Sequence, residues 1–457
     1  MSDRPAAEKL DVSATRVKIS RSPMMSMVSH FCAARIGISL RSGLISGVER
    51  SLALRTTVQC TFIRTDLRQN VAVRCAQEDR AMVMPYTIHI PQERLNAIKA
   101  KVSAYDWSQL PDTGGWKSGV GIDDLRRLTH YWEHDYDWRK VERRLNQLPH
   151  FTTDIEGECI HFLHVRGDGS KPPVLLLHGW PGSFIEFEQL LQPLSADGHD
   201  VIVPSLPGFA FSTPITGVIG PRRAAQLMNT LMKRLFDQSR YIVQGGDWGS
   251  GIAGWLAHDS AEALYGIHLN MADLLVEGIK AGTPEEMDFV ARRDVLLDWE
   301  TGYNHEQETR PQTLGVAMAD SPVGAAAWIL EKFGRWADLP RNANGDPDIW
   351  SAFNEEQLLT NIMLYVATSS FVTATWMYHG KRLEGSGKFP AGTRIQVPTG
   401  FAAFRDPVFI PPPRSFAEKT FNIVHWTEMP RGGHFAAWEQ PDLMLEDLRR
   451  FIAKILV

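Results

Sequence analysis

Residues 241–250, Tyr-Ile-Val-Gln-Gly-Gly-Asp-Trp-Gly-Ser, carry the strongest structural signal in the sequence. The β-branched and aromatic run 241–243 predicts a buried strand, and the stretch 252–258 predicts a helix. Between them, glycines flank Asp247 on both sides, and only glycine accepts the backbone angles of so sharp a turn at little cost. The pattern predicts that Asp247 stands at the tip of a strand–turn–helix element. A β-turn capped by an ordinary aspartate is the alternative, since Asp and Gly are common turn residues.

A carboxylate at such a tip has a distinct chemistry, because it can attack carbon and form an ester with the protein. A serine in the same place would instead take part in ordinary ester hydrolysis. Asp247 therefore favours transfer of an alkyl group, such as the opening of an epoxide or a haloalkane.

The composition is that of an ordinary globular protein, with 457 residues, 44% of them hydrophobic and 22% charged. A net charge of -5 argues against general nucleic-acid binding. The 14 tryptophans suggest large apolar pockets. No run of about 18 apolar residues occurs, so no transmembrane helix is expected. The cysteines show no paired spacing and predict neither a disulfide framework nor a zinc knuckle; they are Cys32, Cys60, Cys75 and Cys159.

Residues 1–83 differ from the rest, because arginine outnumbers the acids and no apolar period persists. We expect a disordered basic tail or an upstream extension here, with a targeting segment as the other reading. The later region has a single thiol, which suits a reducing, cytoplasmic compartment.

Strands and helices alternate through the middle of the chain and predict a parallel sheet with right-handed crossovers, an α/β fold. The expected strands are 160–165, 172–177, 200–204, 241–243 and 264–270, with helices at 222–236 and 252–258. Before them we expect a strand at 86–90, a helix at 92–102 and a long helical region at 123–148.

After residue 270 the alternation stops and helical patterns dominate, at 284–299, 325–333 and 354–378. This predicts a helical cap inserted in the sheet, which would keep water from the strand ends. Strand character returns at 387–397 and 421–426, and a helix closes the chain at 441–456. The expected division is an N-terminal segment at 84–155, a core at 156–273 and 387–457, and a cap at 274–386.

Three further polar positions follow predicted strands. His178-Gly179-Trp180-Pro181 fits one half of an oxyanion hole, with the Trp180 backbone N–H pointing into the site, although a plain Gly-Pro loop is the simpler reading. Asp406 and His434 follow later strands, so that Asp247, Asp406 and His434 stand in the chain order of the α/β-hydrolase triad: nucleophile, acid, base. Asp273 is the alternative acid.

One motif competes with this interpretation. His130-Tyr131-Trp132-Glu133-His134 has the H-x-x-E-H spelling of some zinc proteases, and histidines four residues apart share a helix face. Five residues match by chance easily, however, and neighbouring aromatic residues suggest a packing face. We expect no metal site here.

From residue 84 onward the sequence resembles epoxide hydrolases of the microsomal and juvenile-hormone type, including their N-terminal region. The resemblance is carried by residues 178–183 (His-Gly-Trp-Pro-Gly-Ser), 245–250 (Gly-Gly-Asp-Trp-Gly-Ser) and 431–437 (Arg-Gly-Gly-His-Phe-Ala-Ala), and by an N-terminal signature at 86–95, 109–111 and 114–116. It implies an α/β-hydrolase fold with a helical cap and an N-terminal segment wrapped over both.

The resemblance also implies roles for individual residues. Asp247 would be the nucleophile, His434 the base and Asp406 the acid, although the spacing from the acid to the histidine varies among such enzymes. Trp180 and Trp248 would supply backbone N–H groups to the oxyanion hole. Tyr303 and Tyr378 match the cap tyrosines that activate the epoxide oxygen; either could instead simply pack in the cap core.

The implied function is cofactor-free hydrolysis of lipophilic epoxides to vicinal diols, with the epoxide and water as partners. No membrane segment and no nucleic-acid partner are expected, and a homodimer is compatible with the sequence. A haloalkane dehalogenase would share the Asp247 chemistry, but the cap tyrosines argue against it. A non-catalytic protein that binds hydrophobic ligands is the rival from another class; it would have no need of Asp247 and His434 together.

Overall fold

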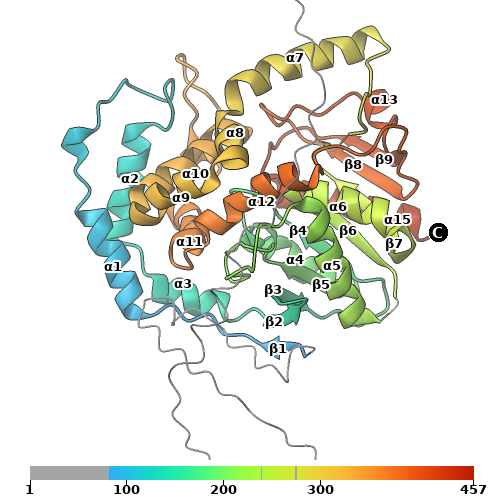
Figure 1. Cartoon of the computed structure of the whole chain (residues 1–457), viewed down its shortest axis with the longest axis horizontal. Coiled ribbons are helices and arrows are strands. Elements are labelled where there is room, and N and C mark those ends of the chain that lie inside the picture. The colour runs from blue at the N-terminus through green and yellow to red at the C-terminus, as the bar shows by residue number, and fades with distance from the viewer. Residues whose placement is uncertain (1–81, 238, 273–274) are drawn as a thin grey trace, which may run out of the picture. The chain divides into compact units, whose positions relative to one another are not determined.

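The structure is a computed structural model that describes residues 82–237, 239–272 and 275–457 (Figure 1). The expectation for residues 1–83 therefore lies almost wholly outside the described residues, as does Asp273.

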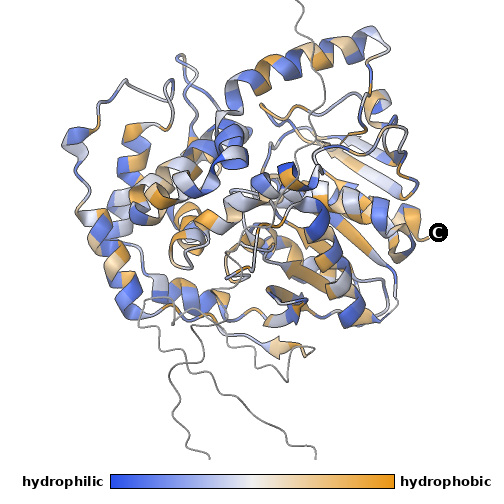
Figure 2. Ribbon diagram, in the orientation of Figure 1, coloured by the Kyte–Doolittle hydropathy of each residue, from blue (hydrophilic) through white to orange (hydrophobic). Residues whose placement is uncertain are grey.

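The described residues form a nine-stranded sheet in the order β1-β2-β3-β5-β4-β6-β7-β8-β9. The run from β5 to β9 is parallel, whereas β1, β2 and β3 form an antiparallel edge. Its parallel strands β4, β5 and β6 are buried along their whole length, which explains why their residues are mostly apolar (Figure 2). The strands are β1 Met84–Pro85, β2 His150–Ile155, β3 Glu158–Val165, β4 Val174–Leu177, β5 Val201–Pro204, β6 Tyr241–Gly245, β7 Leu264–Leu269, β8 Pro398–Ala403 and β9 Asn422–Glu428.

Helices cover both faces of the parallel strands. Right-handed crossovers place α4 on one face and α5 and α6 on the other. α5 packs on α6, and α15 packs on α4. The bounds are α4 Glu188–Ala196, α5 Pro221–Phe236, α6 Trp248–Asp259 and α15 Pro441–Ile455, with the short helices α13 Arg414–Ala417 and α14 Ala436–Glu439 before α15.

A helical layer separates β7 from β8 in the sequence, as predicted for a cap. Within it, α12 packs against α8 and α9, and α10 packs against α9 and α11. The helices are α7 Pro284–Glu300, α8 Gly302–Thr309, α9 Pro311–Asp320, α10 Pro322–Trp336, α11 Glu355–Val366 and α12 Phe371–Glu384.

The N-terminal segment touches both layers. Its strand β1 pairs with β2 in the sheet, while α1 and α2 pack against α10 of the helical layer. Its helices are α1 Gln92–Ser103, α2 Ile122–His134 and α3 Trp138–Leu145. The expected helix at 92–102 is therefore present. The region 123–148, expected to be one long helical region, is divided into α2 and α3. Asp137 caps the start of α3 by accepting a hydrogen bond from the Arg139 backbone N–H.

Two expected strands are wrong. Residues 86–90 alternate between buried and less buried positions as predicted, yet two of their N–H groups bond to side chains at the end of α3: Ile90 to Glu142, and Ile88 to Asn146, which directly follows the helix. Residues 387–397 are irregular, with Gly392 at φ 79°, and the strand begins only at β8. The predicted helical stretch 354–378 is also interrupted between α11 and α12, where Ser369 has φ 60°.

Among the described residues, no single helix is long and apolar enough to cross a membrane; two sharply bent pairs, α9 with α10 and α11 with α12, meet that test by length and composition alone.

Candidate active site

Asp247 stands between β6 and α6 in a strained conformation, with φ 47° and ψ −127°. Close packing enforces this turn. A Cβ on Gly245 would lie 2.3 Å from the carbonyl oxygen of Gly249, and one on Gly249 would lie 2.0 Å from that of Leu177. Both positions therefore require glycine. The strain is held by the surrounding backbone and presents the carboxylate at the end of the strand, as expected for a nucleophile.

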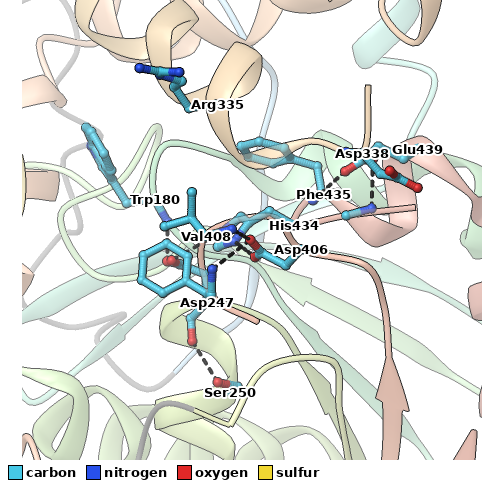
Figure 3. Close-up of polar contacts among 12 residues, drawn as sticks. Trp180, Asp247, Ser250, Arg335, Asp338, Asp406, Val408, His434, Phe435 and Glu439 are labelled. Atoms are coloured by element: carbon cyan, nitrogen blue, oxygen red, sulfur yellow. Dashed lines mark hydrogen bonds and ion pairs between the residues drawn. The ribbon is translucent and has the colours of Figure 1, made fainter. Parts of the chain in front are cut away.

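His434 lies between two carboxylates that come from different parts of the chain (Figure 3). Its Nδ1 is 2.7 Å from Oδ2 of Asp406, and its Nε2 is 3.4 Å from Oδ2 of Asp247. The other oxygen of Asp406 accepts the backbone N–H groups of Val408 and Phe409, at 2.9 and 2.8 Å. Asp406 is thus fixed in a position that orients the imidazole, with the Nε2 edge facing Asp247.

The two carboxylates control the charge of His434. Burial alone would lower the pKa of the imidazole, but the charge and hydrogen bond of Asp406 and the hydrogen bond and charge of Asp247 raise it to about 10. Only 4% of the His434 side chain is exposed, so little water screens this interaction. At neutral pH the free site therefore holds an imidazolium between two carboxylates.

The backbone N–H of Trp180 donates to Oδ1 of Asp247 at 2.8 Å. The loop that carries it is held by Asn361 of α11, which donates to the Pro181 carbonyl at 2.7 Å and accepts from the Ser183 hydroxyl at 2.8 Å. Trp248 is the first residue of α6, so its N–H has no partner inside the helix. The structure thus brings the Trp180 N–H to the Asp247 carboxylate. The Trp248 N–H directly follows Asp247 in the chain, at the start of α6.

Tyr303 of α8 and Tyr378 of α12 lie opposite Asp247 and are both buried. The Tyr378 ring is 4.6 Å from that of Trp248 and 5.9 Å from that of Tyr303. Burial, with the neighbouring Tyr303 and the charge of Asp247, raises the pKa of Tyr378 well above its usual value, so that it keeps its proton. The ammonium of Lys332, itself buried and paired with Glu331, lies 4.4 Å above the Tyr303 ring in a cation–π contact.

Two chambers meet at Asp247. An inner chamber of about 330 Å³ is lined by Trp180, Glu186, Gln244, Asn270 and His434. A cap chamber of about 510 Å³ lies on the other side and is lined by both tyrosines together with Trp248 and Lys381. The Asp247 side chain can therefore face one molecule from the cap and another from the side of His434.

Two acids near the site were not foreseen. Glu439 accepts the backbone N–H groups of Gly433, Phe435 and Asp338, at 2.8 to 2.9 Å, and so clamps the loop of His434 (Figure 3). Glu186 accepts the Ser183 N–H within a capping box, and burial raises its pKa to about 8. The spacing Ser183-x-x-Glu186 is a capping-box signature that could have revealed Glu186; Glu439 has no such signal.

His130 and His134, of the competing zinc motif, stack on the exposed side of α2 with ring centroids 4.2 Å apart. The opposite side buries Leu125, Leu128 and Trp132. In the part of the chain that the structure describes, no group of three or more His, Cys, Asp or Glu side chains could hold a metal ion.

Comparison with known proteins places this geometry in a family. A family model described as epoxide hydrolase N terminus matches residues 83–187, and one for the alpha/beta hydrolase fold matches residues 172–378. The chain is 34% identical to epoxide hydrolase 1 of Oryctolagus cuniculus over 82% of this chain and 89% of that protein. It is equally similar, 34%, to juvenile hormone epoxide hydrolase 2 of Ctenocephalides felis, over 83% and 88% of the two chains.

Solved structures agree. The epoxide hydrolase of Aspergillus niger superposes with a TM-score of 0.71 at 32% identity, covering 82% of this chain and 97% of that one. The juvenile hormone epoxide hydrolase of Bombyx mori superposes with a TM-score of 0.73 at 29% identity, covering 82% and 95%. With relatives matched over most of their own length, and with this fold, the chain belongs to the epoxide hydrolase family of the α/β-hydrolase fold.

Proposed function

We propose that this epoxide hydrolase opens lipophilic epoxides to vicinal diols through an ester on Asp247. The proposal assigns the core to residues 156–273 and 387–457, the cap to 274–386 and the N-terminal segment to 84–155. The observation that carries it is the placement of Asp247 between the tyrosine pair of the cap chamber and the His434–Asp406 pair of the inner chamber.

In the first step the epoxide lies in the cap chamber, where Tyr303 and Tyr378 hydrogen-bond its oxygen. A carboxylate oxygen of Asp247 attacks a ring carbon and the carbon–oxygen bond of the ring breaks. A tyrosine hydroxyl gives its proton to the leaving alkoxide and is left as a phenolate. The product is a hydroxyalkyl ester of Asp247.

The ester changes the charge that His434 faces. Esterification removes the negative charge of Asp247, so the imidazolium loses one of the groups that raise its pKa. Its proton then passes through solvent to the phenolate, and the neutral imidazole can act as a base. Asp406 keeps the hydrogen on Nδ1 and leaves Nε2 to face the inner chamber.

In the second step a water molecule in the inner chamber gives a proton to Nε2 of His434 and attacks the ester carbonyl. The backbone N–H groups of Trp180 and Trp248 would hold the oxyanion, as the 2.8 Å contact from Trp180 to the free carboxylate suggests. Collapse of this intermediate breaks the bond between the carbonyl carbon and the ester oxygen. The departing alkoxide takes the proton of the hydroxyl that water added, which releases the diol and leaves the Asp247 carboxylate and the imidazolium. Substrate, water and the residues of this chain supply every proton and electron pair in the scheme.

The intact mass of a His434→Gln variant, measured after exposure to lipophilic epoxides, tests the scheme. Without the base, the first step should proceed and the second should stall, so the mass should rise by that of one epoxide, on a peptide that contains Asp247. An Asp247→Ala variant is the matched control and should take up no adduct. Full turnover by Asp247→Ala would refute the scheme, and an adduct formed from haloalkanes but from no epoxide would favour a dehalogenase.

A further inference from the structure

Two polar side chains of the inner chamber have hydrogen-bonding capacity that the described residues do not use. They are Glu186, in the 3-10 helix Phe184–Phe187, and Asn270, directly after β7. Both line the chamber together with Asp247 and His434. Buried polar groups in proteins are almost always hydrogen-bonded, so unused capacity beside a nucleophile and its base indicates a small polar ligand.

The amide of Asn270 is fixed beside the Asp247 turn. Its Oδ1 accepts a hydrogen bond from Nε2 of Gln244 at 2.9 Å. A Cβ on Gly246, the residue before Asp247, would lie 2.7 Å from both Nδ2 and Oδ1 of Asn270, so the amide packs directly on the backbone of the turn. Within the described residues, Nδ2 of Asn270 donates no hydrogen bond. Since Oδ1 is bonded to Gln244, the group that Asn270 offers to the chamber is the Nδ2 donor.

Glu186 reaches the same chamber from a different part of the chain. Its Oε1 accepts the Ser183 N–H at 3.1 Å, and within the described residues its Oε2 makes no hydrogen bond. A Cβ on Gly182 would overlap Oε1, so the carboxyl packs tightly against that loop. Burial and the charge of Asp247, partly offset by the charge of His434, raise the pKa of Glu186 to about 8. At neutral pH the carboxyl is therefore mainly neutral, and it can accept a hydrogen bond without placing a negative charge beside an ester of Asp247.

We propose that Asn270 and Glu186 together hold the water molecule that hydrolyses the Asp247 ester. The water donates one hydrogen to Nε2 of His434 and the other to Oε2 of Glu186, and it accepts a hydrogen bond from Nδ2 of Asn270. Its remaining lone pair attacks the ester carbonyl while its proton passes to His434. Three partners are typical of an ordered buried water. The inference rests on the proposed function, because it names the residues that bind the second reactant of that scheme.

Replacing Asn270 with leucine removes the donor at nearly constant side-chain volume. Hydrolysis of the ester should slow by on the order of tenfold to a hundredfold, because the water loses one of its partners. Alkylation uses no water and should be little changed. Stopped-flow single-turnover measurements with a lipophilic epoxide separate the two rates. Intact mass during turnover should show a larger share of the enzyme carrying the adduct than in the wild type.

Asn229→Leu is the matched control, since Asn229 is another buried asparagine next to β6. Its Oδ1 accepts from the Tyr241 hydroxyl at 3.0 Å and its Nδ2 donates to Ser260 at 2.8 Å, and it lines neither chamber. Both steps should proceed at the wild-type rates in this variant. An equal loss of hydrolysis here would show that leucine acts through the fold and would overturn the assignment of Asn270.

Glu186 provides a second test, which holds even where Asn270→Leu fails to fold. Glu186→Gln keeps an uncharged side chain with an acceptor oxygen, whereas Glu186→Met has a similar length and no acceptor. Hydrolysis of the ester should be on the order of tenfold faster in Glu186→Gln than in Glu186→Met. Equal hydrolysis rates in these two variants would exclude Glu186 from the water site.

The outcomes separate the water site from the reaction that it serves. Hydrolysis at the wild-type rate in Asn270→Leu, or equal slowing of alkylation and hydrolysis, would overturn the water site and leave the proposed function standing. Failure of every epoxide to form an adduct on Asp247 in His434→Gln would refute the proposed function itself.

Discussion

Replacing Asp247 with asparagine should lower the pKa of His434 and convert its imidazolium to the neutral base at neutral pH. The substitution imitates the charge of the ester intermediate, since both an amide and an ester are uncharged. It also preserves much of the geometry, because the amide oxygen can still accept the Trp180 N–H that Oδ1 accepts at 2.8 Å. The variant therefore isolates the electrostatic step that the proposed mechanism requires between alkylation and hydrolysis.

The expected size follows from the contact distance. Nε2 of His434 and Oδ2 of Asp247 are 3.4 Å apart. Two unit charges at that separation attract by about 5 kcal/mol at an effective dielectric constant of about 20, and one pKa unit corresponds to about 1.4 kcal/mol. Part of this attraction is spread over both carboxylate oxygens, so we expect a decrease of roughly two to four units. Starting from about 10, the pKa would then approach neutrality, where a general base is most effective.

Histidine titration by NMR measures this shift directly. The protein contains 15 histidines, so the His434 resonance is assigned by its loss in His434→Gln, and intact mass verifies that the asparagine amide has not hydrolysed. Asp200→Asn is the control, since Asp200 lies 2.9 Å from Nε2 of His164; it should lower the pKa of His164 and leave His434 unchanged. A decrease of less than about one unit in Asp247→Asn would refute the charge-controlled step.

Three further predictions concern neighbouring groups. Glu439→Gln should destabilise the protein by about 1–3 kcal/mol in chemical unfolding, because one amide oxygen replaces a carboxylate that accepts three N–H groups, and it should slow hydrolysis of the ester in single-turnover experiments. The raised pKa of Glu186, about 8, means that its contribution to stability is fully present below pH 4.5 and is lost as the pH rises through 8. Glu186→Gln should therefore gain stability relative to the wild type between pH 5 and 9, and equal pH profiles of melting temperature would contradict this. Tyr303→Phe should slow alkylation by about 10²-fold in stopped-flow measurements while the hydrolysis rate of the ester stays unchanged.

The parts of the site that sequence predicted best are those that local geometry determines. Glycines on both sides of Asp247 are needed by any chain that turns directly from β6 into α6, and the contacts of Gly245 and Gly249 show why. Asp247, Asp406 and His434 come together because each follows a strand of the parallel part of the sheet, and those strands end at the same edge. Each of these positions follows a strand in a short local pattern, so it is visible without the structure.

The parts that sequence missed depend on contacts between distant segments. Residues 86–90 alternate like a strand, but the side chains of α3 take the hydrogen bonds that a neighbouring strand would have taken. Glu439 acts through three backbone N–H groups, one of which comes from Asp338 in the region between β7 and β8, and no local pattern reveals such a contact. Both Asp406 and Asp273 follow predicted strands, so the sequence leaves Asp273 as an alternative acid; the structure brings Asp406 to 2.7 Å from His434, while Asp273 lies outside the described residues.

The placement of charge suggests why Asp247 and His434, the proposed nucleophile and base, can share so small a space. A neutral histidine 3.4 Å from Asp247 would be ready to activate water before any epoxide had bound, whereas the imidazolium that the two carboxylates favour cannot. Alkylation of Asp247 removes its negative charge, and Asp406 continues to hold the His434 imidazole. In the proposed scheme the base is therefore released by the formation of the intermediate that it must hydrolyse.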